Sequence, residues 1–356
     1  MTELVLPVSA PALPQVIKGR HYTTSHRGVE LSDAIYEDCH FDNLTWSGCR
    51  LSSLRFVNCR FDENRFESCN FRNLIFEGCI FRITKWFECT LAGISLIGGE
   101  ISDSVWASCV VKDTNFAKMA GSHWIFDAVR AMHVSIVESD LSNVTLNGGQ
   151  WSNASWITTQ LREASVMGVE LVNFIFGMSG CSKWSITDCS GINVRWINSR
   201  IEQMTIRSCE LRQAAWSHST WEHGEISSSQ LPIASFDHAQ VAHISVRNVE
   251  LMQAIFDHAR VVDSDMQRLR APRIGLRHTQ LVRVQLSGAE LFGLDARGAV
   301  LEDVGLNGAD CRSGLLTGQP RRVWMASDTR GSTFDEAADD DDRPWRQRIQ
   351  PGARGV

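Results

Sequence analysis

Apolar residues recur at every fifth position along most of this chain. From Leu31 to Leu316, each fifth residue is large and apolar except at seven small residues, and we call all of these residues centre positions. The residue two places before each centre, which we call the small position, is mostly small or apolar and is never charged. Because 21% of the chain is charged, this spacing indicates a fold that buries two residues in every five. The seven small centres are Gly121, Ala131, Cys181, Gly191, Ala271, Ala296 and Cys311.

A period of five excludes both an α-helix and a flat β-strand. Five steps along an α-helix rotate the side chain about 140° away from its starting face, and five steps along a flat strand reverse the face. The chain must therefore turn a corner once per repeat, and four corners close a square coil of about 20 residues. Three further ladders have this longer period. Cysteines fill small positions at 39, 59 and 79 and at 49, 69, 89 and 109, and histidines stand at 218, 238, 258 and 278.

The repeat resembles that of the pentapeptide repeat proteins, whose loose motif is small, polar, Leu or Phe, then two variable residues. Matching stretches are CNFRN (69–73), SDLSN (139–143), AELFG (289–293) and ADCRS (309–313). The resemblance implies an all-β fold, a right-handed quadrilateral parallel β-helix of about 14 coils. This chain departs from the motif in its wide centres, such as Trp151 and Trp216, which we expect to distort some coils.

The repeat divides the chain into three parts. Residues 29–316 form the predicted β-helix domain. Residues 1–28 lack the repeat and are apolar enough to cap the first coil, since the end of a solenoid exposes its core. Residues 317–356 contain DEAADDDD and RPWRQR, which is typical of a mobile tail.

Charge and composition narrow the function classes. The net charge of −6 disfavours binding to a nucleic acid backbone. No apolar run is long enough to span a membrane, and prolines interrupt the first apolar segment, so we expect no secretory signal and a cytoplasmic protein. Secretion by a route that needs no signal would leave the same sequence.

The cysteines invite a metal or disulfide interpretation, but their spacing lacks the close pairs that zinc sites use. Because they occupy the small position, we expect reduced thiols that pack as small apolar groups. We predict neither a metal nor a cofactor.

Three other groups are candidate sites. The ladder of His218, His238, His258 and His278 could be a metal stripe or a pH sensor, or only a solvated residue copied with the repeat. A crowd of arginines could dock an acidic partner, or could be a solvated surface. In the tail, Trp345 between Arg343 and Arg346 has the residue types that anchor interfaces, although the segment could also be only solubilising. The arginines of the crowd are Arg260, Arg268, Arg270, Arg273, Arg277 and Arg283.

No catalytic or phosphate-binding motif occurs, and a filled coil leaves no pocket for a small-molecule substrate. We therefore expect a non-enzymatic, rigid scaffold whose partners are other proteins, and a coil end could also join two copies. By analogy with the family, such a scaffold could be an adaptor or accessory of a bacterial type VI secretion system. Two alternatives implied by the resemblance are a DNA-mimicking inhibitor of a type II topoisomerase and an effector secreted into a host.

Overall fold

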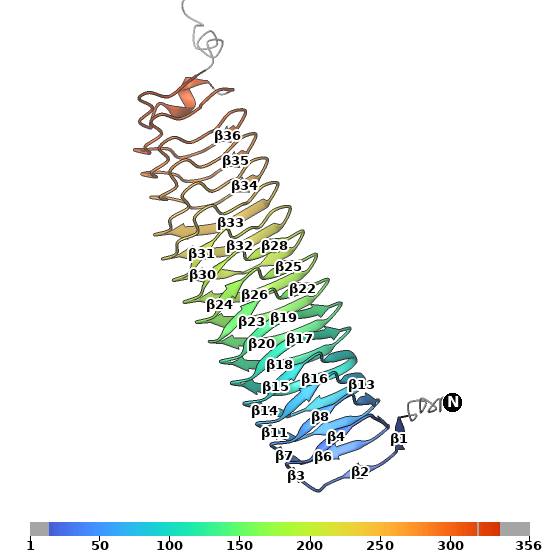
Figure 1. The fold of residues 1–356 in the computed structure, drawn as a ribbon. Helices are drawn as coiled ribbons and strands as arrows, with labels where there is room; N and C mark the ends of the chain where they lie inside the picture. The colour runs from blue at the N-terminus through green and yellow to red at the C-terminus, as the bar shows by residue number, and fades with distance from the viewer. Residues whose placement is uncertain (1–13, 319, 335–356) are drawn as a thin grey trace, which may run out of the picture.

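The computed structural model describes residues 14–318 and 320–334, which form one long rod (Figure 1). The chain winds into about 14 stacked coils. Each residue of the repeat lies beside the residue 20 places later, as Phe56 lies beside Phe76, and the pairing is parallel. The predicted quadrilateral parallel β-helix is thus confirmed.

Short strands form the sides of the coils, and one short 3₁₀ helix, η1 (Arg321–Trp324), follows them. The strands are β1 (Gln15–Lys18), β2 (His21–Tyr22), β3 (His26–Arg27), β4 (Glu30–Ser32), β5 (Ala34–Glu37), β6 (His40–Asp42), β7 (Thr45–Ser47), β8 (Arg50–Ser52), β9 (Arg55–Val57), β10 (Arg60–Asp62), β11 (Arg65–Glu67), β12 (Asn70–Arg72), β13 (Ile75–Arg82), β14 (Lys85–Phe87), β15 (Thr90–Ala92), β16 (Ser95–Ala107), β17 (Val110–Ala117), β18 (Ala120–Asp127), β19 (Arg130–Val137), β20 (Asp140–Asn147), β21 (Gln150–Ser152), β22 (Ser155–Ile157), β23 (Gln160–Met167), β24 (Glu170–Val172), β25 (Ile175–Gly177), β26 (Gly180–Thr187), β27 (Ser190–Ile192), β28 (Arg195–Ile197), β29 (Arg200–Glu202), β30 (Thr205–Arg207), β31 (Glu210–Arg212), β32 (Thr220–Ser227), β33 (Gln240–Arg247), β34 (Arg260–Val262), β35 (Gln280–Val282) and β36 (Val300–Glu302).

The centre and small positions line the interior, as the period predicts. Centre residues one coil apart stack their rings, and the centroids of Phe41 and Phe61, and of Phe61 and Phe81, are each 4.7 Å apart. The cysteines of the small positions are all buried with free thiols, which agrees with the predicted packing role. Burial raises the pKa of the Cys311 thiol to about 11, so this thiol stays protonated at neutral pH.

The residue two places after each centre turns the corner, and we call it the corner residue. Its backbone is left-handed at nearly every turn, with φ of 51° at Asn43 and at Asn58 and 53° at Asn73. Asn, Asp and Gly tolerate this conformation better than other residues, which explains why they fill many corners. The corner N–H donates to a carbonyl of the next coil, as Asn43 N does to Asp62 O at 2.9 Å.

Polar residues are tolerated at the small position because they satisfy backbone groups there. The Sγ of Cys69 donates to the carbonyl of Trp46 at 3.3 Å. Asn64 Nδ2 donates to Phe41 O at 2.7 Å. The thiol and the amide N–H thus donate to backbone carbonyls inside the rod, whereas the buried Oδ1 of Asn64 has no partner among the protein atoms.

Tryptophans fit where a small residue stands beside them. Trp124 occupies a small position, and the neighbouring centre is Gly121, where a Cβ would lie 2.4 Å from the indole nitrogen. The Trp124 Nε1 donates to Ile101 O at 2.7 Å. Trp221 at a centre position and Gly224 at the neighbouring small position show the converse arrangement of one large and one absent side chain. The 20-residue register continues through these coils, so the expected distortion does not alter the pairing.

The register changes only at the two ends of the described rod. In the first coil Tyr22 pairs with Phe41, 19 residues on, and in the last coil Asp310 pairs with Asp328, 18 residues on. η1 follows residue 320, and its Trp324 is buried. Residues 14–28 and 320–334 thus add ordered structure to segments predicted as a cap and a tail, while the boundaries at 28 and 316 remain predictions.

Candidate functional site

The predicted histidine ladder is present as a stack of exposed rings. Neighbouring centroids along His218, His238, His258 and His278 are 4.8, 4.7 and 5.2 Å apart, and the rings tilt by at most 22°. All four are corner residues with φ between 55° and 59°. The repeated left-handed turn therefore projects the rings from one edge of the rod, which the sequence period alone did not show.

One end of this ladder carries a carboxylate. His238 Nδ1 lies 3.0 Å from Asp237 Oδ2, and with His218 these groups offer ligand atoms within 4.8 Å of one another. Protonation of the stacked rings would place like charges one coil apart. Both the metal stripe and the pH sensor remain predictions.

The arginine crowd surrounds the rod and does not form a single face. The six arginines lie on all four sides of the coils. Most of their guanidinium groups contact a neighbouring carboxylate or amide. Arg270 pairs with Glu290 at 3.2 Å, and Arg277 pairs with the buried carboxylate of Asp257. Arg283 pairs with Asp263, Arg260 contacts Gln280, and Arg268 and Arg273 are corner residues. The role of these arginines in binding remains a prediction.

A shallow groove crosses the same coils and was not predicted. It encloses about 190 Å³ between a charged ladder and an apolar one. Met252 and, just beyond the groove, Phe292 are 50% and 44% exposed, which is unusual for large apolar side chains that continue one ladder. Only the register of the coils aligns these residues. The groove is lined by Gln230, Glu250, Arg270 and Glu290 on one side and by Pro232, Met252 and Pro272 on the other.

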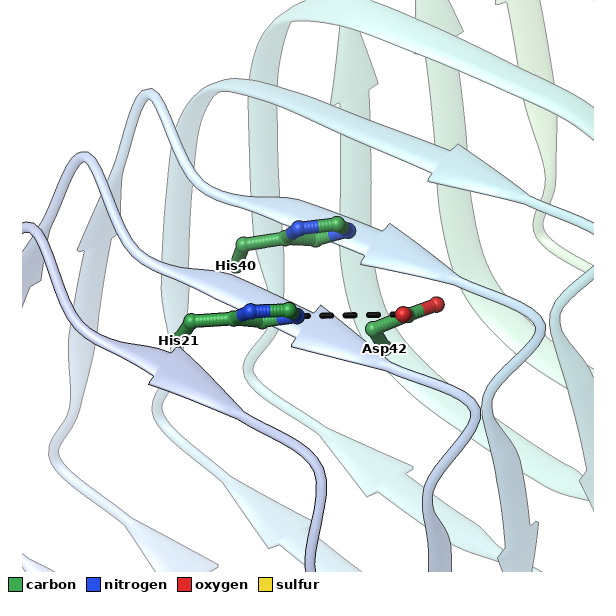
Figure 2. A group of neighbouring side chains, drawn as sticks. All are labelled: His21, His40 and Asp42. Atoms are coloured by element: carbon green, nitrogen blue, oxygen red, sulfur yellow. Dashed lines mark ion pairs between the residues drawn. The ribbon is translucent and has the colours of Figure 1, made fainter.

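A second histidine cluster lies at the other end of the rod, on β2 and β6. Figure 2 shows His21 and His40 with parallel rings and the carboxylate of Asp42 beside them. The ring centroids are 4.7 Å apart, and His21 Nε2 lies 3.7 Å from Asp42 Oδ2. Sequence reasoning missed this cluster because His21 precedes the regular repeat. The spacing of His40 and Asp42 around an inward-facing Phe41 was the available signal.

The predicted interface anchors Arg343, Trp345 and Arg346 lie outside the described residues and remain predictions. Inside the rod, the void between Phe71 and Trp106 measures about 20 Å³, which has room for about one water molecule and not for a small-molecule ligand. No helix among the described residues is long and apolar enough to cross a membrane.

Residues 29–106 match the family model of the pentapeptide repeat region. A search of curated proteins found no significant match. Among solved structures, the chain is similar to HetL, a pentapeptide repeat protein of the cyanobacterium Nostoc, with 12% identity, a TM-score of 0.22, and coverage of 80% of this chain and 89% of HetL. It is also similar to full-length QnrB1, a plasmid-mediated fluoroquinolone resistance protein, with 15% identity, a TM-score of 0.24, and coverage of 64% and 95%.

A mannuronic-acid-specific polysaccharide lyase from human gut microbiota matches over 91% of this chain and 93% of its own length, with 9% identity and a TM-score of 0.35. The assignment of a pentapeptide repeat region depends on the family model and covers residues 29–106. The matched segment has the five-residue sides and 20-residue coils that continue in unchanged register to Leu316. The comparisons therefore identify a pentapeptide repeat region at residues 29–106, and coils of the same geometry continue beyond it.

Proposed function

We propose that this chain is a rigid, non-enzymatic rod that binds other proteins. The observation that carries the proposal is the unbroken stacking of one coil type, with aromatic and aliphatic side chains filling the interior. Such a rod holds its surface groups at fixed spacing, so binding costs little ordering of the backbone.

We place the main binding surface at the groove that contains Met252. Exposed apolar side chains next to fixed charges are typical of protein interfaces. The Glu250–Arg270–Glu290 ladder alternates in charge, which favours a partner segment with an apolar side chain flanked by polar groups. A nucleic acid fits this surface poorly, because the carboxylates would repel phosphates.

Site-specific photo-crosslinking tests this placement. A photoreactive residue at Met252 or Phe292 should give discrete adducts with another protein in the cells that express this chain. Met178 supplies the matched control, because it is 60% exposed and lies on a different side of the coil. Equal adducts from Met178, or no discrete adduct from either groove position, would contradict the proposal.

At a finer level we propose an adaptor role in a bacterial assembly such as a type VI secretion system, in the cytoplasm, where the cysteine-rich small positions would stay reduced. Delivery into a host as an effector is the alternative location for the same binding rod. The DNA-mimicking alternative needs a continuous acidic face. The arginine–aspartate pairs in the C-terminal coils interrupt such a face, so this alternative has less support.

A further inference from the structure

We propose that His21, His40, Asp42 and Asp62 form a binding site for a divalent transition-metal ion of the zinc type. The three groups in Figure 2 offer ligand atoms within 4.8 Å of one another. Asp62 lies next to this group, with its Oδ2 2.8 Å from His40 Nε2, and it would complete the donor set when the side chains turn toward an ion. Two imidazole nitrogens with carboxylate oxygens are a donor set that zinc and copper accept in proteins.

The fold places these four side chains together without a loop. His40 and Asp42 flank the buried centre Phe41, so both project outward from β6 on the same side of the pleat. Because the strands pair in parallel register, His21 of β2 lies beside His40 of β6, and Asp62 of β10 lies beside Asp42 of β6. Three successive coils therefore supply ligands to one spot.

The shortened first coil is what creates the histidine pair. With the ordinary 20-residue step, Arg20 would lie beside His40. The step of 19 residues places His21 there instead, which exchanges a guanidinium for a second imidazole. The register change at the end of the rod thus has a consequence for ligand chemistry.

The surroundings of the site suit a bound cation. Asp62 is only 17% exposed, and its buried Oδ1 has no hydrogen-bond partner among the protein atoms. Arg60 lies 3.4 Å from Asp62 Oδ2, whereas Arg82, the register partner of Asp62 one coil later, lies 3.5 Å from the carboxylate of Glu100. His21 is 55% exposed, so its side chain can rotate until its nitrogen and that of His40 converge on an ion about 2.0–2.1 Å away.

A metal ion at this site would fasten the first described coil to the second. An end coil has a neighbour on one side only, so its backbone opens more easily than the backbone of a central coil. Binding to the native rod stabilises the joined strands β2 and β6 by mass action. The chemical partner inferred here is the metal ion itself.

Copper and zinc titrations of the untagged, full-length chain test the proposal. The His238→Ala background disrupts the other described group of two histidines and a carboxylate, His218, Asp237 and His238, so that the N-terminal cluster is the one three-residue group left among the described residues. In this background we expect one Cu²⁺ ion with two coordinated nitrogens by electron paramagnetic resonance. His21→Ala should leave one nitrogen, and the Zn²⁺ affinity measured by calorimetry should fall at least tenfold.

His133→Ala is the matched control, because His133 also faces a single aspartate, with Nδ1 3.1 Å from Asp113 Oδ1, on an exposed corner. It should leave the affinity and the spectrum unchanged. Hydrogen exchange supplies a readout that does not depend on the ligand variants: Zn²⁺ should slow exchange in β2 and β6 and not in β34 or β35. Unchanged affinity in His21→Ala, or an equal loss in His133→Ala, would overturn the proposal.

Discussion

The N-terminal and C-terminal coils turn the same corners with different hydrogen bonds. In several coils of the N-terminal and central parts, the N–H of a small-position residue donates to the side chain one coil later, as Cys49 N does to Cys69 Sγ at 3.4 Å. In many C-terminal coils a different bond forms. There the N–H donates to the carbonyl three residues earlier, as Ala239 N does to Phe236 O at 2.9 Å.

Two positions near the change of pattern differ both in the side chain one coil later and in the bond that forms. Ser199 has Ser219 one coil later, and its N–H donates to that hydroxyl at 3.0 Å. Ser219 has Ala239 one coil later, and its N–H donates to the carbonyl of Trp216 at 3.2 Å. Farther along, Ile244 has Ser264 after it and again donates to a hydroxyl.

The two regions thus differ in what accepts the hydrogen bond of the small-position N–H. A buried N–H without an acceptor is costly, and in many C-terminal coils a hydrogen-bonded turn supplies the acceptor, even at Ala259, where Thr279 follows one coil later. The sides next to such turns shorten from strands to single bridges, as at Ala215 and Ser235. The core is continuous across both regions, and only the corners differ.

The largest expected effect tests whether the two regions share one cooperative core. Phe76→Asp should destabilise the rod by roughly 4 kcal/mol or more, because a charge would enter a dry interior. Ile75→Asp, one residue away and 39% exposed, is the matched control and should melt close to the parent protein. Urea unfolding followed by tryptophan fluorescence measures both, and similar midpoints would contradict the inward assignment of Phe76.

The next effect concerns the pairing of a large residue with a neighbouring glycine, as at Trp124 and Gly121, which lets the coil keep its register. Gly121→Leu should cost about 1–3 kcal/mol, since the new side chain would overlap the Trp124 indole and the Ile101 carbonyl. The double variant Gly121→Leu with Trp124→Val should recover at least half of that loss. Thermal unfolding of the two variants checks this, and an equally unstable double variant would show that the indole is not the obstacle.

A smaller effect tests the hydrogen bond of the small-position N–H directly. Ser219→Ala should cost roughly 1–2 kcal/mol, because the N–H of Ser199 would lose its acceptor. Ala239→Ser is the converse control in a corner that already closes on its own carbonyl, and it should change the unfolding free energy little. Hydrogen exchange at the Ser199 amide should accelerate only in the first variant. Equal exchange rates of the Ser199 amide in both variants would show that the Ser219 hydroxyl does not protect this N–H.

The smallest effect distinguishes the regions by pH. Hydrogen bonds from Arg283, Arg297 and Arg312 lower the pKa of Asp263, Asp295 and Asp310. A lowered carboxyl pKa contributes stability above the unfolded value of about 3.9, and this stability is lost as the pH falls through the folded pKa.

Acidification from pH 5 to pH 3 should therefore loosen the C-terminal coils before the coils around Phe61, as measured by hydrogen exchange. Simultaneous loosening along the rod would show that these exposed pairs contribute nothing local.

The sequence predicted the fold well because its signal is periodic. The five-residue spacing identified the inward side chains from Leu31 to Leu316, and the structure confirms their burial almost throughout. The candidate sites were harder to predict. The histidine ladder was visible as a 20-residue repeat, whereas the pairing of His21 with His40 depends on a register step of 19 that no period announces.

By itself, the sequence determined the period, the inward positions and the ladders, because each follows from which residues can be buried at a fixed spacing. The tertiary structure decided which outward residues meet. The left-handed corners set the direction of the histidine rings, and the parallel register aligned Met252 with its neighbours in the groove. The short first coil brought His21 to His40. These contacts join residues 19 or 20 positions apart, and their geometry depends on the coil being closed.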